Sequence, residues 1–112
     1  MQYAEIHENG TIDSWSSTTS LTSKIAGQTT VVRNGYLYVL GGLDGVSYLF
    51  LNIVQYSQIH ADGSIGLWNS TTSLLSDRYF HTSIIYSDYL YVLGGFATSN
   101  NNNEVHFAPF LE

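Results

Sequence analysis

The chain repeats itself with an offset of 53 residues. Residues 3–42 align without a gap against residues 56–95, and 20 of the 40 positions are identical. The run Tyr-Leu-Tyr-Val-Leu-Gly-Gly at residues 36–42 returns unchanged at residues 89–95. A period of about 50 residues is typical of repeat architectures, in which one unit cannot bury its apolar faces alone and stacks on its neighbours. The repeat therefore constrains the fold most strongly, and it raises a problem, because only about two units are present.

The composition excludes several classes of function. A length of 112 residues suggests one domain. The formal net charge is −6, and the three basic residues Lys24, Arg33 and Arg78 are scattered. Nucleic acids and anionic membrane surfaces need clustered Lys and Arg, so neither is an expected partner. No apolar run is long enough to span a bilayer, so membrane insertion is not expected. There is no signal peptide in view, and the cellular location is not readable.

Strand signals dominate the chain, and helix signals are almost missing. Residues 29–33 and 36–40 flank Asn34 and Gly35, a pair that tolerates the positive φ angles of a type I′ hairpin. The second occurrence places residues 82–86 and 89–93 around Ser87 and Asp88. A second kind of hairpin joins residues 54–60 to 64–68, and it returns as residues 3–7 and 11–15. Each repeat therefore predicts four short strands, named a, b, c and d in chain order.

The predicted strands define one unit, residues 1–112. Residues 1–20 supply strands c and d, residues 28–73 a complete a-b-c-d set, and residues 81–110 strands a, b and c. Four-stranded antiparallel units at this period are β-propeller blades, so the predicted fold class is all-β. Both ends carry a strand c, one more than a shared blade can hold. We favour pairing of the C-terminal strand c with the strand b of its own chain.

A set of Gly and aromatic residues carries a family resemblance. Strand b ends in a Gly pair, strand c carries a Tyr or Phe, and strand d carries a Trp. The members are Gly41, Gly42, Tyr56 and Trp68, then Gly94, Gly95 and Phe107, and finally Tyr3 and Trp15. This ordered set resembles the kelch repeat in its bacterial form, and the resemblance covers nearly the whole chain. The hairpin between the Tyr and the Trp is longer than in the common kelch pattern.

The resemblance implies a ring that this chain cannot close alone. Kelch propellers usually close with several blades, and a blade without a neighbour exposes apolar faces. In one interpretation several chains assemble as a homotrimer or homotetramer, and strands c and d of one chain complete strands a and b of the next. In the other, the chain is a piece of a longer propeller. The two interpretations are compatible with each other.

The candidate binding residues lie in the connections between strands d and a and between strands b and c. These connections differ most between the two occurrences, and variable loops on a rigid scaffold are where binding usually occurs. Arg78, Tyr79 and His81 form the most reactive-looking cluster, and Asp44 and Tyr48 could add contacts. In the structural alternative, Arg78 and His81 hydrogen-bond neighbouring backbone, and Asp44 and Tyr48 only make a loop polar.

Few features point to catalysis, and no cofactor is expected. A zinc site needs three or four converging ligands, and no such cluster is apparent. His7 and His60 occupy equivalent repeat positions, which suggests a structural role, and His106 reads as a partly exposed sheet residue. There is no nucleophile elbow. Copper chemistry of the kelch-like sugar oxidases needs a Tyr–Cys pair, and the chain has no Cys.

We therefore expect a non-enzymatic binding or scaffold module that assembles with itself by sharing blades. The kelch resemblance implies a protein ligand or, as in secreted relatives, a glycan. One alternative is a purely structural repeat, recently amplified or engineered, without an evolved ligand. A sugar-processing propeller is the other. An axial pocket gathering Arg78, Tyr79 and His81 would favour ligand binding. A channel lined only by small strand-a residues, Thr29, Thr30, Thr82 and Ser83, would favour the scaffold.

Overall fold

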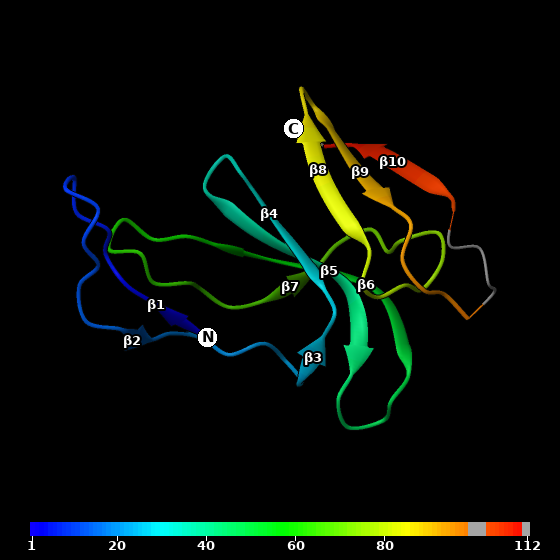
Figure 1. Ribbon diagram of the computed structural model, residues 1–112, viewed down its shortest axis with the longest axis horizontal. Helices are drawn as coiled ribbons and strands as arrows, with labels where there is room; N and C mark the ends of the chain where they lie inside the picture. Colours follow the sequence, from blue (N-terminus) through cyan, green and yellow to red (C-terminus); the bar gives the residue numbers. More distant parts are fainter. Residues whose placement is uncertain (99–102, 111–112) are drawn as a thin grey trace.

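The computed structural model describes residues 1–98 and 103–110, and every regular element in these ranges is a β-strand. The strands form three antiparallel sheets, which confirms the all-β prediction (Figure 1). Within the same ranges, no helix is long and apolar enough to cross a membrane.

The largest sheet has five strands and contains the predicted complete a-b-c-d set. Its members are β3 (Ile25–Ala26), β4 (Thr29–Arg33), β5 (Tyr36–Asp44), β6 (Phe50–Gln58) and β7 (Asn69–Ser70). β5 pairs with β4 along its first half and with β3 near its end, and β6 and β7 follow in order on its other side. The φ angles of Asn34 and Gly35 are 52° and 80°, so the type I′ turn predicted between β4 and β5 is present.

The second occurrence of the repeat forms a three-stranded sheet in the order β10-β9-β8. Its bounds are β8 (Thr82–Tyr86), β9 (Tyr89–Leu93) and β10 (Val105–Pro109). β10 pairs with β9 over five residues, so the C-terminal strand c does pair with the strand b of its own chain. The N-terminal strands β1 (Gln2–Tyr3) and β2 (Ser16–Ser17) pair only with each other, in the register of β6 and β7 shifted by the repeat.

Two predicted strand boundaries were wrong. The Gly pair does not end β5, because positive φ angles at Gly41 and Gly42 let the chain kink, and the strand then continues to Asp44. Strand d is not residues 64–68 but the two residues of β7, which come after Trp68. Before Trp68, the pairing with the end of strand c is reduced to an isolated bridge between Ile59 and Ile65.

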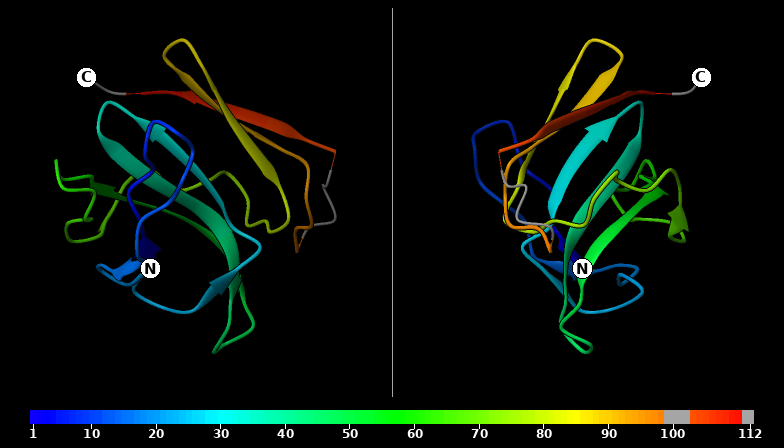
Figure 2. Two further views of the ribbon diagram at one scale, coloured as in Figure 1. Left: turned by 60° about the vertical axis from the view of Figure 1, so that its left-hand side comes forward. Right: turned by 90° about the vertical axis from the view of Figure 1, so that its right-hand side faces the viewer.

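The five-stranded and three-stranded sheets meet along β4 and β8, and we call this contact region the seam (Figure 2). Leu40, Val54 and Val92 are its fully buried centre. Half-buried apolar residues surround this centre: Val31, Tyr38, Leu74 and Leu90. Alternation along β5 turns Leu37 and Val39 to the opposite side of the sheet, away from the seam.

Close backbone approach explains the Gly pairs. A Cβ atom on Gly41 would lie 2.6 Å from the carbonyl oxygen of Arg78, across the seam. The amide of Gly42 donates to the same oxygen at 2.9 Å. A Cβ atom on Gly95 would lie 2.7 Å from the carbonyl oxygen of Tyr79. These Gly residues therefore let strand b lie directly against the segment that precedes strand a.

Candidate functional site

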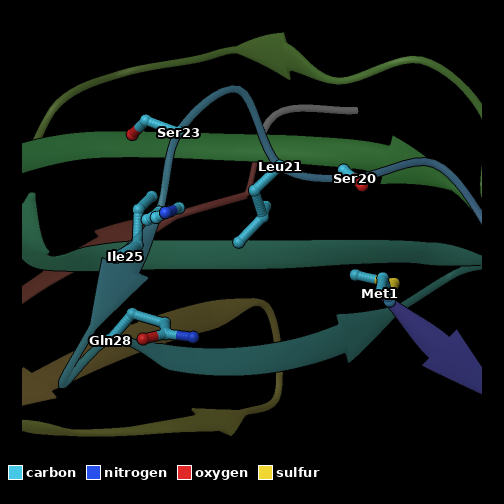
Figure 3. A pocket seen from close by; sticks show the side chains of 7 residues that line it. Met1, Ser20, Leu21, Ser23, Ile25 and Gln28 are labelled. Atoms are coloured by element: carbon cyan, nitrogen blue, oxygen red, sulfur yellow. The ribbon is translucent and has the colours of Figure 1, made fainter. Parts of the chain in front are cut away.

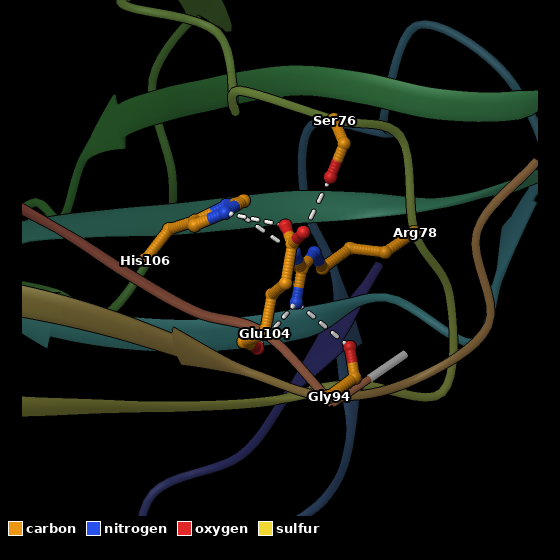
Figure 4. A network of polar contacts seen from close by, with 5 residues as sticks. All are labelled: Ser76, Arg78, Gly94, Glu104 and His106. Atoms are coloured by element: carbon orange, nitrogen blue, oxygen red, sulfur yellow. Dashed lines mark hydrogen bonds and ion pairs between the residues drawn. The ribbon is translucent and has the colours of Figure 1, made fainter. Parts of the chain in front are cut away.

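Arg78 lies at the seam and is only 1% exposed. Its guanidinium donates to the carbonyl oxygen of Gly94 at 2.8 Å, to Ser76 Oγ at 3.2 Å and to His106 Nδ1 at 3.2 Å (Figure 4). A longer contact of 3.4 Å reaches the carbonyl oxygen of Glu104. Hydrogen bonding of Arg78 to neighbouring backbone is therefore observed, as the structural alternative expected.

The hydrogen bonds assign the protons of His106. Because the Arg78 guanidinium can only donate, Nδ1 of His106 must accept. Nε2 then carries the proton and donates to the Glu104 carboxylate at 2.8 Å. The buried positive charge of Arg78 is thus connected to a half-exposed carboxylate through a neutral imidazole. Nε of Arg78 has no hydrogen-bond partner among the described residues.

The backbone of Arg78 belongs to the other side of the seam. Its amide donates to the carbonyl oxygen of Leu51 at 3.2 Å, and its carbonyl accepts from the amide of Gly42. The main chain of Arg78 is therefore bound to the five-stranded sheet, while its guanidinium is bound to the end of β9 and the start of β10. One residue fixes the two sheets relative to each other.

His81 is a second buried polar group at the seam, 3% exposed. Its Nε2 lies 2.7 Å from Thr29 Oγ1, which also lies 2.5 Å from Ser83 Oγ. Burial lowers the pKa of His81 to about 4, and the nearby positive charge of Arg78 acts in the same direction. The carbonyl group of Leu40 acts against this lowering of the pKa. Nδ1 of His81 nevertheless has no hydrogen-bond partner among the described residues. The imidazole is therefore neutral at neutral pH.

Tyr79 lies in an aromatic cluster at one end of the seam. Its ring centroid is 4.6 Å from that of Phe50, 4.7 Å from Phe80 and 5.5 Å from Phe96. Phe80 has a φ of 56° at the repeat position of Gly27, whose φ is 67°. The amide of Phe80 donates to the carbonyl oxygen of Gly27 at 2.7 Å, so these two equivalent residues meet directly across the seam.

Asp44 is the last residue of β5, and Tyr48 lies in the loop that follows, between β5 and β6. Asp44 accepts hydrogen bonds from the amides of Val46 at 2.7 Å and Ser47 at 3.1 Å, and these bonds lower the pKa of its carboxyl group. Tyr48 is 75% exposed. Among the described residues, no side-chain hydrogen bond or ion pair joins this loop to Arg78 or His81. The five predicted binding residues therefore divide into a buried seam cluster and an exposed loop.

The sequence reasoning missed the partners of Arg78 and His81. Strand alternation could have found two of them, since Glu104 and His106 are two residues apart and share one face of the C-terminal strand. Thr29 and Ser83 gave no such signal, because small polar residues are common in strands. No group of three His, Asp, Glu or Cys that could hold a metal ion occurs in the part of the chain that the structure describes.

The aromatic residues of the repeat are covered to different degrees. Tyr56 stacks on Tyr38 with ring centroids 6.0 Å apart, and Phe107 stacks on Tyr91 at 5.8 Å with the same interplanar angle of 27°. In each pair, an aromatic residue of strand b stacks on an aromatic residue of strand c, and the two pairs occupy equivalent positions of the repeat. Phe107 is nevertheless exposed, whereas Tyr56 is half-buried.

Trp15 and Trp68 differ in the same way. Trp68 is half-buried, and its indole nitrogen lies 3.4 Å from the carbonyl oxygen of Thr19. Trp15, in the N-terminal hairpin, is exposed. The repeat position is covered by a neighbouring segment in one occurrence and uncovered in the other.

The innermost strands, β4 and β8, also differ in the exposure of equivalent residues. In β4, Val31 is half-buried against the seam and Val32 is exposed. In β8, the equivalent Ile84 is exposed and Ile85 is half-buried. We call Ile84, Leu93, Val105 and Phe107 the open face of the three-stranded sheet. Thr30, Val32 and Leu37, which β4–β5 pairing places together, form the outer face of the five-stranded sheet.

No protein-family model matches the chain, and no curated protein gives a significant match.

The geometry indicates what the site can do. Most donors of Arg78 and the Nε2 atom of His81 are bonded to groups of the same chain, and both side chains are almost inaccessible. The arrangement therefore holds two apolar sheets face to face. The repeat equivalents of Val31, Leu40 and Val54 are exposed on the open face, whereas on the outer face Val32 is exposed, Leu37 is half-buried and Val39 is buried.

Proposed function

We propose that this chain is a self-assembling β-propeller module with kelch-type repeats, acting as a non-enzymatic binding scaffold. The supporting observation is the inverted exposure of equivalent residues. Ile84 is 58% exposed where Val31 packs in the seam, and Val105 is 54% exposed where Val54 is 4% exposed. A sheet that is apolar on both sides needs a neighbour on both sides.

The free energy available from covering these faces is large. Fully burying one Ile, Leu, Val or Phe side chain contributes about 1.5–3 kcal/mol. The open face carries four such side chains, and the outer face adds Val32 and Leu37. Exposed apolar patches of this kind mark interaction sites or aggregation surfaces. When a specific neighbour covers these faces, the free energy of burial stabilises a defined assembly and does not drive aggregation.

A scaffold fits the buried polar residues better than a ligand site does. Arg78 and His81 are bonded inside the seam, and the strand-a residues beside them, Thr29 and Ser83, are small. The close match of the two occurrences, with 20 of 40 positions identical, also supports the related alternative, in which the chain is a purely structural amplified repeat. Both versions require self-assembly.

Blade sharing requires one of the two c strands to leave its place. β10 pairs with β9 over five residues, whereas β1 pairs with β2 over two. β1 is therefore the weaker strand. When it detaches, Ser16 and Ser17 of β2 can pair with Phe107 and His106 of another copy, as Asn69 and Ser70 of β7 pair with Tyr56 and Gln55. This pairing gives the shared blade four strands.

The mass in solution tests the proposal. Size exclusion with light scattering should give a discrete species of three or four times 12.4 kDa, for a ring of six or eight blades. A folded monomer that persists at high protein concentration would overturn the proposal. Polydisperse aggregates would also count against it, because they would show that the faces have no specific neighbour.

A further inference from the structure

We infer that the occupant of the open face is a second copy of this chain, docked head to tail, with Thr82 of one copy against Thr30 of the next. This inference rests on the proposed function and specifies its interface. The three-stranded sheet of one copy lies on the outer face of the five-stranded sheet of the next. The seam inside each chain provides the template, because both surfaces of the new contact are repeat equivalents of the surfaces that meet there.

The apolar residues of the two faces match. In the seam, Leu40 and Val54 on one side meet Val92 on the other, with Leu74 and Leu90 packed around them. The repeat equivalents of the first side lie on the open face, and those of the second side lie on the outer face. Shifting each residue by the repeat places Leu93 and Val105 of one copy against Leu21 and Leu37 of the next, which lie beside Val39, a residue already 3% exposed within its own chain.

Polar side chains on the innermost strands fix the register. In the seam, Thr29 Oγ1 lies 2.5 Å from Ser83 Oγ. The repeat equivalent of Thr29 is Thr82, and that of Ser83 is Thr30. Both Thr30 and Thr82 are exposed within one chain. Head-to-tail docking brings their hydroxyl groups together in the geometry of the seam.

Two backbone hydrogen bonds of the seam are expected to recur between copies. The amide of Gly42 donates to the carbonyl oxygen of Arg78, so the amide of Gly95 should donate to Ile25 of the second copy. The amide of Phe80 donates to Gly27, so the amide of Gly27 in the second copy should donate to Phe80. These bonds need no particular side chain, so they survive the substitutions between the occurrences.

A groove lined by Met1 and by the segment that precedes β4 provides the seat. It has a volume of about 500 Å³, and Leu21, Ile25, Gln28 and Met1 are among the residues that line it (Figure 3). The repeat equivalents of Leu21, Ile25 and Gln28 are Leu74, Arg78 and His81, which lie against the five-stranded sheet in the seam. The groove is thus the surface that would receive the Gly94–Gly95 end of β9 from a second copy. Met1 leaves this surface when β1 detaches.

The contact between copies lacks the charged groups of the seam. Arg33 forms an ion pair with Asp88 at 2.9 Å and lies over the ring of Phe110 at 4.5 Å. The repeat equivalents of Arg33 and Asp88 are Tyr86 and Gly35, which cannot form that pair. The contact between copies is therefore weaker than the seam, so dilution should separate folded chains before it unfolds them.

Disulfide trapping tests whether the copies dock head to tail. The chain has no cysteine, so two single variants, Thr30→Cys and Thr82→Cys, each carry one thiol. In the seam, Thr29 Oγ1 and Ser83 Oγ lie 2.5 Å apart. We therefore expect cysteines at the equivalent positions of two docked copies to come within reach of a disulfide bond. One variant carries a mass tag, and the two are mixed under mild oxidation. We expect the 30–82 heterodimer as the main cross-linked product. The exposed Thr11→Cys variant, located in the N-terminal hairpin, is the matched control and should give little product with either partner.

The outcomes separate the two proposals. An assembly in solution that yields 30–30 or 82–82 homodimers in place of the heterodimer would overturn head-to-tail docking and leave self-assembly standing. A chain that stays monomeric would overturn both. The double variant Thr29→Cys/Ser83→Cys should form an intrachain disulfide across the seam without a change in mass, and this result shows that the oxidation is sufficient.

Discussion

Leu40 and Leu93 occupy the same position of the repeat, 53 residues apart, yet Leu40 is fully buried and Leu93 is 37% exposed. The same seven residues, Tyr-Leu-Tyr-Val-Leu-Gly-Gly, surround both positions, and both Gly pairs have positive φ angles. What differs is the neighbour, because Leu40 faces the three-stranded sheet across the seam. The exposure of Leu93 thus supports the proposal that a second copy covers this face, and the following prediction tests this proposal.

Ile84→Lys should abolish assembly without unfolding the chain. Ile84 is on the open face and 58% exposed, so Lys costs little in the single chain, within about 0.5 kcal/mol for a typical surface substitution. In the assembly, the same Lys would be a buried charge without a partner. Light scattering should give a mass of 12.4 kDa with an unchanged circular dichroism spectrum.

Leu67→Lys is the control for this variant. Leu67 is 81% exposed in the hairpin between strands c and d, and its repeat equivalent is already polar, Ser14. The Leu67 variant should keep the mass of the wild-type protein. If both variants assembled normally, the open face would not be an interface.

Arg78→Met should destabilise the fold strongly. The substitution leaves the carbonyl oxygen of Gly94 and Nδ1 of His106 without their donor, so we expect a loss of about 3 kcal/mol in the free energy of unfolding. Urea denaturation measures this loss. Arg33→Met removes an ion pair whose Asp88 is exposed, and should cost less than about 1 kcal/mol. Equal losses would contradict a special role for the Arg78 network.

The order of the strands a, b, c and d could be predicted from the sequence, but the short strand β3 and some strand ends could not. Apolar alternation and the Asn34–Gly35 turn identified β4 and β5 to within a few residues. The extension of β5 beyond its Gly pair depends on pairing with β3, a contact between distant segments. Strand d was misplaced because the strong strand propensity of Trp68 suggested that this residue lies inside the strand. In the structure Trp68 precedes the strand, and its indole nitrogen lies close to the carbonyl oxygen of Thr19.

The candidate site was located in part. Difference between the two occurrences pointed to the segment with Arg78 and His81, and the structure places both side chains in the buried seam, while their role in ligand binding stays a prediction. Sequence alone could not show that both side chains turn inward. That outcome depends on the seam, where the segment is enclosed between two sheets. Asp44 and Tyr48 stayed in a loop of their own because Asp44 bonds its nearest amides.

Stability should fall in mild acid because of His81. Its pKa in the folded protein is about 4, below its ordinary value of 6.5, so the folded state resists protonation. The unfolded chain binds a proton as the pH falls below 6.5, and the folded chain follows only near 4. The contribution of neutral His81 is therefore complete above pH 6.5 and is lost progressively between 6.5 and 4.

His81→Gln isolates this contribution, because Gln is the residue at the repeat-equivalent position 28. Urea midpoints at pH 7 and pH 5 should differ less in the variant than in the wild-type protein. The other titrating groups are common to both proteins and cancel in the comparison. Equal pH dependence in the two proteins would show that His81 is protonated without cost in the fold.

Gly41→Ala should test whether the Gly pair exists for close packing or only for its backbone angles. Gly41 and Gly35 both have positive φ, 61° and 80°, so Ala is strained at either position by about 1 kcal/mol. A Cβ atom at Gly35 meets nothing within 4 Å, whereas at Gly41 it would lie 2.6 Å from the carbonyl oxygen of Arg78. That overlap forces the two sheets apart at the seam, so we expect Gly41→Ala to cost about 3 kcal/mol in urea denaturation, well above Gly35→Ala. Similar losses for the two variants would mean that the seam yields easily at this point, and that the Gly pair serves the kink in β5 alone.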